Sequence, residues 1–521
     1  MAKDTLVINV DIAETRVAFI EDGKLAELFI ERETDRSPVG NIYLGQVTRV
    51  LPGMQAAFVD IGLDRAAFLH VEDLMSQEDL DKLLAAGDEP EGADDEAEPA
   101  AEANGEAKRP QAAARKVTRS TPIRDVVQEG QTVIVQVSKG SIGTKGARVT
   151  GHVSLPGRYV VYLPTVEHVG ISKRIGSDRE RQRLREAIDA LKPPQGGFIV
   201  RTLATGLTKK TLKADVGYLV REWEQVMARR AQVKSVPALL YKDLDIILRT
   251  ARDYFTEDVA KIVIDSPSEY ERLRGFLAAF MPERANDIEL YAGSDLIFDE
   301  YGIEDEIARA TSRKVPLPSG GYLIFDQTEA LTAIDVNTGR FTGRGKDVEE
   351  TIYETNLEAA QEIAYQLRFR NIGGLIVLDF IDMEKVGNRD KVYRAFAKAL
   401  KRDRSTTTVT RISELGLLEM TRKRTRESLG RTLYEPCFYC DGTGHIQSKA
   451  TVCHEIVRQI GREKDTLVGY RVTINAHPAI CDALRREHKA ALDEAANRCQ
   501  RQILVRPRLE YHLEQFDLQG S

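Results

Sequence analysis

Short runs of apolar residues, separated by turn residues, follow one another along most of this chain. Near the N-terminus, residues 5–12, 15–22 and 24–32 are three such runs, each long enough to form a strand. The connections between them are very short, so the pattern predicts a meander of three antiparallel strands. From about residue 40 to 151 the runs become shorter and glycine marks many of the turns, which predicts a second β-rich region.

A different pattern lies between Leu331 and Met383. Two strand-like runs there, LTAIDVNTG and GGLIVLDFIDM, each carry carboxylates at or near their ends. Between them, apolar residues recur three and four positions apart from Glu349 to Asn371, which predicts an amphipathic helix that ends at Gly373-Gly374. A strand, helix and strand in this order most simply pair their strands in parallel through a right-handed crossover.

The polar side chains of these two strands are candidates for a metal site. Asp335 and Asn337 lie two residues apart and share a face, and Asp379 arrives at the same sheet edge from the neighbouring strand. Carboxylate and amide oxygens suit Mg²⁺, and metal-bound water can attack a phosphate. Aspartates at strand ends are also common turn formers, and spacing alone does not separate the two interpretations. Asp382 falls on the opposite face if the strand continues past Asp379.

Two cysteines near the C-terminal end have the spacing of half a zinc site. Cys437 and Cys440 form a Cys-x-x-Cys pair followed by glycine turns, which supplies two thiolates of a tetrahedral zinc centre. The other two ligands come either from nearby residues, with His445, Cys453 and His454 as candidates, or from the same pair in a second chain. A redox role needs a thioredoxin-like context, which the sequence lacks.

Charge is unevenly distributed along the chain. The formal net charge is −7, but residues 88–106 hold nine acidic and no basic residues, so the rest carries 74 Lys and Arg against 72 acids, or +2. This Ala-, Glu- and Pro-rich stretch predicts a disordered insert over residues 86–116. A solvated loop is the simpler interpretation, and a regulatory mimic of a nucleic acid is the alternative.

The number of cysteines and the hydropathy of the chain indicate the cellular compartment of the protein. Five cysteines are too few for a disulfide framework in a chain of this length, and an odd number cannot all be paired. No signal peptide or stretch of about 18 uninterrupted apolar residues is visible. We therefore expect a cytoplasmic protein.

Long sequence motifs give the chain a family resemblance. Together they resemble the ribonuclease E/G family of bacterial endoribonucleases, and the motifs are AAFVDIG, RAAFLH, LPSGGYLIFDQTEALTAIDVNTG, ETNLEAAQEIAYQLRFRNIGGLIVLDFIDM, LLEMTRKRTRESL and CFYCDGTGH. The resemblance extends over nearly the whole chain. The MTRKRTRESL run, and the lack of a long scaffold tail after it, resemble the ribonuclease G branch.

The resemblance implies an α/β multidomain fold that is α+β overall. The expected parts are a ribonuclease H-like subdomain (1–39 and 248–311), an inserted S1 barrel of the OB type (40–151), a 5′-monophosphate sensor region (152–247), a DNase I-like catalytic domain (312–433), a zinc-link (434–448) and a small dimerisation domain (449–521). In this family the ribonuclease H-like part has no active site of its own.

The same resemblance implies which residues act in catalysis and in sensing. Asp335 and Asp379 fall on the family's catalytic Mg²⁺ ligands, with Asn337 as the supporting amide. Arg201 and Thr202 fall on the groups that hold a 5′-monophosphate, and Val161 lies beneath the terminal base. Lys173-Arg174 departs from the two arginines that ribonuclease E has at this place.

RNA-binding residues are expected in the barrel and beyond the catalytic domain. Phe58 and Phe68 are placed by the resemblance to stack on bases and Lys145 to meet the backbone, whereas each Phe alone would more simply fill the barrel core. The basic run Thr421–Arg431 either follows the RNA backbone or forms a solvated helix face.

The expected function is that of a Mg²⁺-dependent endoribonuclease that hydrolyses single-stranded RNA. By resemblance it acts on ribosomal RNA precursors and messenger RNA, is stimulated by a 5′-monophosphate and leaves 5′-phosphate products. The partner expected at the Cys437 and Cys440 site is a second copy of the chain, giving a homodimer joined by shared Zn²⁺, or a dimer of dimers. The alternative is a non-catalytic RNA-binding or ribosome-assembly factor that keeps the S1 platform.

Overall fold

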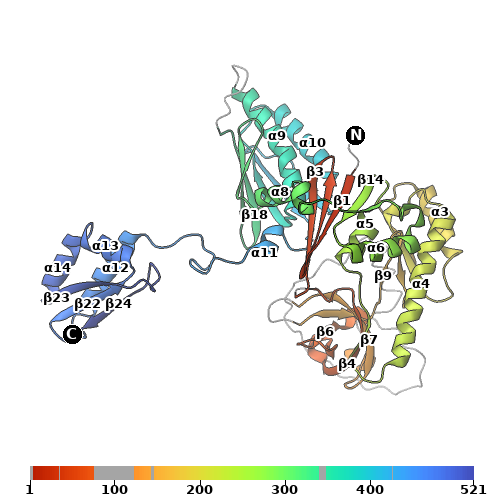
Figure 1. The fold of residues 1–521 in the computed structure, drawn as a ribbon, viewed down its shortest axis with the longest axis horizontal. Coiled ribbons are helices and arrows are strands. Elements are labelled where there is room, and N and C mark those ends of the chain that lie inside the picture. Colours follow the sequence, from red (N-terminus) through yellow and green to blue (C-terminus); the bar gives the residue numbers. More distant parts are fainter. Residues whose placement is uncertain (1–3, 35, 75–121, 142–145, 340–347, 425) are drawn as a thin grey trace, which may run out of the picture. The chain divides into compact units, whose positions relative to one another are not determined.

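The computed structural model divides the chain into two compact units, Met1–Leu429 and Gly430–Ser521. Figure 1 shows the ribbon coloured along the sequence. The structure describes residues 4–34, 36–74, 122–141, 146–339, 348–424 and 426–521.

The N-terminal strands begin a five-stranded sheet that a later part of the chain completes. Its order is β15 (Ile288–Leu290), β14 (Val259–Ile264), β1 (Asp4–Val10), β2 (Glu14–Glu21), β3 (Lys24–Arg32). The first three strands in sequence form the expected antiparallel meander, whereas β1 pairs with β14 in parallel. Helices α5 (Ile246–Tyr254) and α6 (Pro267–Phe280) contribute to its apolar core, and α7 (Ile297–Glu300) and α8 (Ile303–Ala310) follow.

The expected second β region forms a closed five-stranded barrel. Its strands are β4 (Ile42–Leu51), β5 (Ala56–Asp60), β6 (Ala67–His70), β8 (Arg148–Thr150) and β7 (Thr132–Lys139), and a β4 to β7 pairing closes it. Strand β13 (Ala238–Tyr241) adds to β4, and α2 (Ile123–Val126) precedes β7. Alternate residues of β5 and β6 are buried in the barrel core, as a half-buried strand requires. The predicted insert at 86–116 lies outside the described residues.

A smaller four-stranded sheet follows the barrel in the sequence. Its order is β11 (Val169–Ile171), β12 (Gly197–Val200), β10 (Val160–Leu163), β9 (Leu155–Pro156). Apolar residues of α3 (Asp178–Asp189) and α4 (Lys209–Gln232) share one core with this sheet. Ser177 and Thr208 cap these helices by accepting hydrogen bonds from main-chain N–H groups.

The last sheet of the first unit carries the strand, helix and strand that the sequence predicted. Its order is β16 (Lys314–Pro316), β17 (Tyr322–Gln327), β18 (Leu331–Asn337), β19 (Gly374–Asp379), β21 (Leu417–Arg422), β20 (Thr407–Val409), and β18 and β19 are parallel. Helices α9 (Val348–Phe369) and α10 (Val386–Leu400) pack together beside it (Figure 1) and share its core.

Burial alternates strictly along β18. Thr332, Ile334 and Val336 are buried, whereas Ala333 and Asp335 are exposed on the other face. The helices therefore cover one face of the sheet, and the polar side chains of β18 point to the opposite one.

The end of α9 differs slightly from the prediction, which placed the stop at Gly373-Gly374. Asn371 takes the left-handed conformation, with a φ of 49°, and Ile372 N donates to Leu367 O at 3.0 Å. This is the hydrogen-bond pattern of a Schellman cap, in which asparagine can replace glycine. The helix is therefore stopped by Asn371, and Gly374 serves the entry into β19.

The second unit is a small α/β unit. Its three-stranded sheet has the order β23 (Gln502–Pro507), β22 (Arg471–Ala476), β24 (Phe516–Gly520), and its helices are α11 (Leu429–Leu433, at the boundary), α12 (Lys449–Arg462), α13 (Pro478–Arg485) and α14 (Lys489–Cys499). One apolar core joins the sheet to α12, α13 and α14. Within the described parts of both units, no helix is long and apolar enough to cross a membrane.

Candidate functional site

The two carboxylates singled out in the sequence lie side by side at the ends of neighbouring strands. Asp335 on β18 is the direct register partner of Asp379 on β19, and both residues are exposed. Both point to the face of the sheet that α9 and α10 leave uncovered. The parallel pairing is the reason that two residues 44 positions apart meet at one edge.

The amide of Asn337 supports this pair. Its Nδ2 donates a hydrogen bond to Asp335 Oδ2 at 2.7 Å, on the same face of β18. The bond holds one oxygen of the carboxylate in place, and it leaves the amide oxygen of Asn337 for another ligand.

Negative charge accumulates around Asp379. Burial and the charges of Asp335 and Asp382 raise the pKa of its carboxyl above the usual value. A cation between Asp335 and Asp379 would relieve that repulsion, so the donors fit a hard divalent ion such as Mg²⁺, which uses few protein oxygens and keeps waters. Among the described residues, no group of three or more His, Cys, Asp or Glu is arranged to hold a metal.

Asp382 does not follow the geometry expected of a continuing strand. Strand β19 ends at Asp379, so Asp382 lies in the loop that follows. Its negative charge acts on Asp379. The structure therefore keeps Asp382 near the pair without adding it to a three-carboxylate metal cluster.

Two polar residues of α9 that the sequence did not single out hold the loop after β19. The fully buried Asn356 donates from Nδ2 to Ile381 O at 2.7 Å and accepts from Ile381 N at 3.1 Å. Glu349, in the first turn of the helix, accepts from the main-chain N of Glu384 at 3.1 Å and of Lys385 at 3.2 Å. A buried asparagine inside an apolar helix face was the signal that could have identified the first of them.

The two predicted stacking residues face outward from the barrel. Phe58 and Phe68 are register partners on β5 and β6, with ring centroids 6.1 Å apart, and both are half-buried between fully buried neighbours. The ring of His70, two residues further along β6, lies stacked at 6.4 Å from Phe68. Lys145 lies outside the described residues.

Basic residues extend this aromatic pair sideways across the barrel. Arg49 on β4 pairs with Phe58, and Arg148 on β8 pairs with Phe68 and with Lys139 on β7. Partners on neighbouring strands carry their side chains on the same side of a sheet. One row therefore crosses all five strands with two rings at its centre and cations on both sides, an arrangement that suits single-stranded nucleic acid. Arg49, Arg148 and Lys139 could not be recognised without the register.

The predicted phosphate-sensing residues meet on the four-stranded sheet. Arg201 directly follows β12, and Val161 on β10 is the register partner of Ile199, so Val161 and Arg201 belong to the same face. Val161 is half-buried and Thr202 is exposed. Arg201 Nη1 donates to Gly157 O at 2.7 Å, and the same atom donates to a carboxylate of α5 that is described below.

The turn beside Arg201 is shaped by a buried carboxylate. Asp215 on α4 accepts hydrogen bonds from the main-chain N of Arg158, Tyr159 and Val160, at 3.3, 2.8 and 3.0 Å. Burial raises the pKa of Asp215, and these three donors lower it in part. Tyr159 O in turn accepts from Arg201 N at 2.8 Å, so Asp215 fixes the backbone against which Arg201 is placed.

The Cys-x-x-Cys pair lies on a compact turn of the second unit. Cys437 is exposed and Cys440 is partly exposed. Gly444 N donates to Cys440 Sγ at 3.3 Å, and this bond is the main reason that the pKa of Cys440 is lowered. Of the local candidates for the missing ligands, Cys453 is fully buried in the core and burial raises the pKa of its thiol to about 11.

The basic run 421–431 begins within β21 and contains both buried and exposed residues. Arg422 is 4% exposed and pairs with Asp403, with Nε 2.6 Å from Oδ2. Arg426 is half-buried, donates to Leu28 O at 2.7 Å and lies 3.9 Å from the ring centre of Phe29. Arg422 and Arg426 therefore join elements of the first unit. Lys423 and Arg424 are exposed, and for them the solvated face or RNA track stays a prediction.

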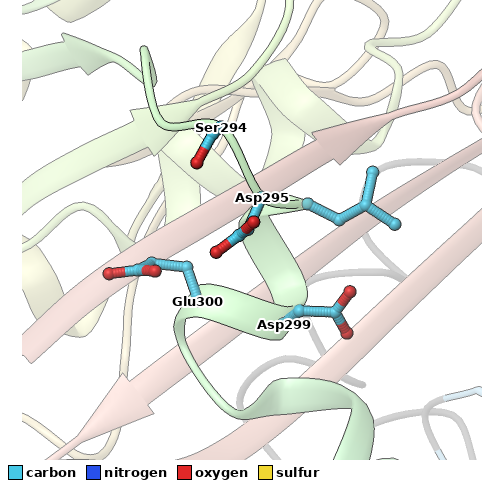
Figure 2. A pocket seen from close by; sticks show the side chains of 5 residues that line it. Ser294, Asp295, Asp299 and Glu300 are labelled. Carbon is cyan, nitrogen blue, oxygen red and sulfur yellow. The ribbon is translucent and has the colours of Figure 1, made fainter.

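A hollow elsewhere in the first unit is unsuited to an anionic ligand. It is lined by Ser294, Asp295, Leu296, Asp299 and Glu300, and Figure 2 shows their side chains around the short helix α7. Its lining has three carboxylates and no basic side chain, so it offers a phosphate backbone no cationic partner of the kind that the barrel row and the Arg201 pocket provide.

Comparison with known proteins identifies the family of the chain. Residues 154–425 match the profile described as "Ribonuclease E/G family". Ribonuclease G of Salmonella typhimurium (strain SL1344) is 44% identical over 513 residues, which are 98% of this chain and 99% of the relative. For ribonuclease G of Escherichia coli (strain K12) the identity is 43% with the same coverage. Ribonuclease E of that strain is 39% identical over 86% of this chain and 39% of its own length. The family prediction is confirmed, and this chain belongs to the ribonuclease E/G family.

Proposed function

We propose that this protein is a Mg²⁺-dependent endoribonuclease that hydrolyses single-stranded RNA and leaves a 5′-phosphate on the downstream product. The observation that carries the proposal is the register pairing of Asp335 with Asp379 at one edge of the sheet. Family membership supplies the reaction class, ribonuclease, and the curated relatives named above carry it in their names.

Each residue of the site has a separate role in this proposal. Asp335 and Asp379 hold the metal ion, and Asn337 fixes the Asp335 carboxylate through its amide N–H. Bound Mg²⁺ supplies an activated water and neutralises the phosphoryl oxygens. Asn356, through its two bonds to Ile381, keeps the loop after Asp379 in place.

Substrate binding is assigned to the barrel row and to the Arg201 pocket. Phe58 and Phe68 stack on bases, an interaction worth about 1–3 kcal/mol per base whatever the sequence. Arg201 presents a planar fork of donors to a 5′-monophosphate, with Thr202 beside it and Val161 under the terminal base. The half-buried position of Arg201 beside exposed Thr202 supports this assignment.

Finer features of the proposal follow the family resemblance. The five-stranded sheet corresponds to the ribonuclease H-like subdomain, the barrel to an S1 domain and the six-stranded sheet to the DNase I-like catalytic domain. Cys437 and Cys440 bind Zn²⁺ together with the same pair of a second chain, which gives a homodimer. Ribosomal RNA precursors and messenger RNA in the cytoplasm are the proposed substrates.

The decisive experiment compares aspartate variants on a 5′-monophosphorylated, single-stranded RNA in the presence of Mg²⁺. We expect Asp335→Asn and Asp379→Asn each to lower the cleavage rate by at least about 100-fold, because loss of a metal ligand costs no less than loss of its supporting partner. Asp382→Asn, made in parallel, measures the share of the third carboxylate. Asp299→Asn in the acidic hollow is the matched control and should cleave like the parent.

A parent protein that binds the RNA without cutting it would favour the alternative, a non-catalytic RNA-binding or ribosome-assembly factor. If Asp335→Asn cuts as well as the parent, the metal site has been assigned to the wrong residues. Mass spectrometry of the products checks the position of the phosphate.

A further inference from the structure

The phosphate-sensing arginine is bonded to the last turn of α5. Arg201 Nη1 donates to Asp253 Oδ1 at 2.8 Å, and Arg252 donates to the same carboxylate from Nε at 3.1 Å and from Nη2 at 2.9 Å. Burial alone would raise the pKa of the Asp253 carboxyl. The hydrogen bonds and charges of Arg252 and Arg201 outweigh burial and bring this pKa below its usual value, so the carboxylate is ionised. A phosphate arriving at Arg201 would compete with Asp253 for the same guanidinium.

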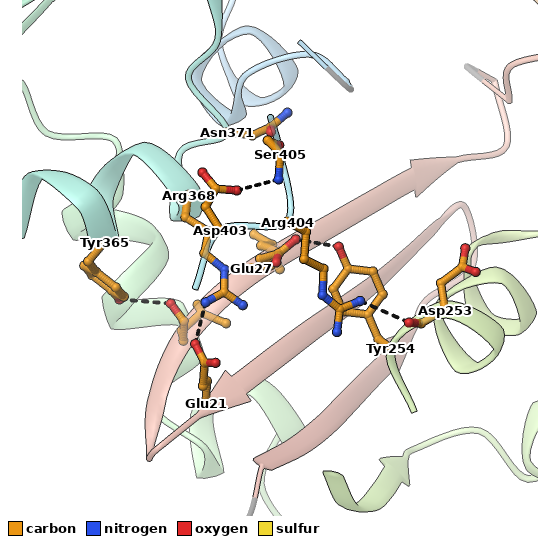
Figure 3. A network of polar contacts seen from close by, with 12 residues as sticks. Glu21, Glu27, Asp253, Tyr254, Tyr365, Arg368, Asn371, Asp403, Arg404 and Ser405 are labelled. Carbon is orange, nitrogen blue, oxygen red and sulfur yellow. Dashed lines mark hydrogen bonds and ion pairs between the residues drawn. The ribbon is translucent and has the colours of Figure 1, made fainter. Parts of the chain in front are cut away.

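The last turn of α5 also contacts the loop between α10 and β20 of the six-stranded sheet. Arg404, in the loop between α10 and β20, donates from Nη1 to the main-chain O of Asp253 at 3.0 Å. Its guanidinium lies 3.9 Å from the ring centre of Tyr254, whose hydroxyl donates to Glu27 Oε2 at 2.7 Å. Figure 3 shows Arg404 between the ring of Tyr254 and the backbone of Asp253. Asp253 therefore contacts the sensor through its side chain and Arg404 through its carbonyl.

The loop that carries Arg404 is bonded to the sheet that carries Asp379. Asp403, the preceding residue, forms the buried ion pair with Arg422. Arg422 Nη1 also donates to Ile372 O at 3.0 Å, two residues before β19 begins. A further contact reaches the loop from the sensor region, since Arg174 Nη2 donates to Thr406 Oγ1 at 3.0 Å.

We propose that Arg404 is a positioning residue that couples occupancy of the Arg201 pocket to the catalytic sheet. A 5′-phosphate that takes Arg201 from Asp253 leaves that carboxylate bonded to Arg252 alone, and the resulting shift of the last turn of α5 passes through the Asp253 carbonyl to Arg404 and the loop 401–406. A shift of this loop moves the buried ion pair of Asp403 and Arg422, and Arg422 is bonded to Ile372 just before β19. The inference rests on the proposed sensing of a 5′-monophosphate, and it adds the route by which sensing reaches the site of cleavage.

Arg404 is suited to a test because its removal should not endanger the fold. The residue is exposed, and it contacts neither Asp335 nor Asp379 in the described structure. A matched control lies two residues away: Arg402 is also exposed, and its Nη1 lies 3.1 Å from Asp22 Oδ2, away from α5. Arg404→Gln and Arg402→Gln therefore remove the same charge from the same loop, and only the first breaks the contact with Asp253.

The experiment measures kcat and KM for two RNAs of one sequence, carrying a 5′-monophosphate or a 5′-hydroxyl, with Mg²⁺ present. We expect the parent to cleave the monophosphorylated RNA faster, by a factor within the roughly 5- to 150-fold range of allosteric coupling. Arg404→Gln should lower kcat on that RNA toward the value for the 5′-hydroxyl RNA, with KM little changed and cleavage of the 5′-hydroxyl RNA unaltered. Arg402→Gln should behave like the parent, and Arg404→Lys should restore part of the preference.

A double variant shows whether Arg404 and Arg201 act on one path. If they do, Arg201→Gln with Arg404→Gln loses no more preference than Arg201→Gln alone. Losses that multiply would overturn the proposal, as would an Arg404→Gln variant that keeps the full preference or one that loses activity equally on both RNAs. Failure of sensing itself is recognised separately, because the parent would then cleave both RNAs at the same rate.

Discussion

The ion pair of Asp403 and Arg422 lies in the interior of the first unit, so its loss should lower the free energy of unfolding. The two side chains are 4% and 3% exposed, respectively. Replacing Arg422 by Met leaves the carboxylate uncompensated in the interior, which costs about 3–5 kcal/mol. We therefore expect Arg422→Met to lower the urea midpoint of the first unit clearly, as followed by the fluorescence of Trp223, the only tryptophan of the chain.

The surface pair of Arg402 and Asp22 provides the comparison. Its side chains are 65% and 58% exposed, so Arg402→Met should change stability by less than about 1 kcal/mol. Equal midpoints for the two variants would mean that the Asp403 pair is far more hydrated than its geometry indicates.

The partners of single residues in the basic run could not be predicted from the sequence. A run of arginines suggested a solvated face or an RNA track because local charge is all that the pattern contains. The partners that bury them are distant: Asp403 lies 19 positions before Arg422, and Glu27, 3.4 Å from Arg426, lies 399 positions away. The paired aspartates could be found because local periodicity sufficed, whereas Asn356 and Arg404 depend on tertiary contacts.

Helix α9 determines the position of the loop that follows the second aspartate. Asn356 bonds both the N–H and the C=O of Ile381. Asn356→Ala leaves both groups without this partner, at a cost of about 1–3 kcal/mol for each that stays unsatisfied. We expect kcat to fall more than KM changes, because the end of β19 that carries Asp379 loses its support.

Cleavage kinetics and thermal unfolding check that expectation together. Gln361→Ala, an exposed amide on the same helix, is the control and should match the parent in both. An Asn356→Ala variant with the kinetics of Gln361→Ala would show that the loop is held by other contacts.

At the scale of elements, the sequence predicted those parts whose pattern is local. The N-terminal meander and the strand, helix and strand around Asp335 were found because their periods and turns lie within short windows. The sheet orders could not be found in that way. Strands β17 and β21, which flank the parallel pair in antiparallel orientation, and β14 beside β1 are placed by long-range pairing that no local period encodes.

For the whole molecule, the cysteine pair predicts a link between metal content and assembly. If Cys437 and Cys440 share one Zn²⁺ with a second chain, elemental analysis should give about one zinc per two chains. Chelation, or Cys437→Ser with Cys440→Ser, should then shift the sedimenting species from dimer toward monomer. One zinc per chain would instead favour local ligands, with His445 as the first candidate, and Cys499→Ser in the same unit serves as the control.

The parallel pairing of β1 with β14 has a consequence for the order in which the chain can fold during synthesis. The first sheet begins at Asp4, but β14, the parallel partner of β1, begins at Val259, about 250 residues later. At a translation rate of about 5–20 residues per second, the meander waits roughly 12–50 s for that strand to leave the ribosome. The barrel strands, all synthesised by Thr150, can close in the meantime. The N-terminal strands are therefore synthesised before the barrel strands but obtain their full set of neighbours after them.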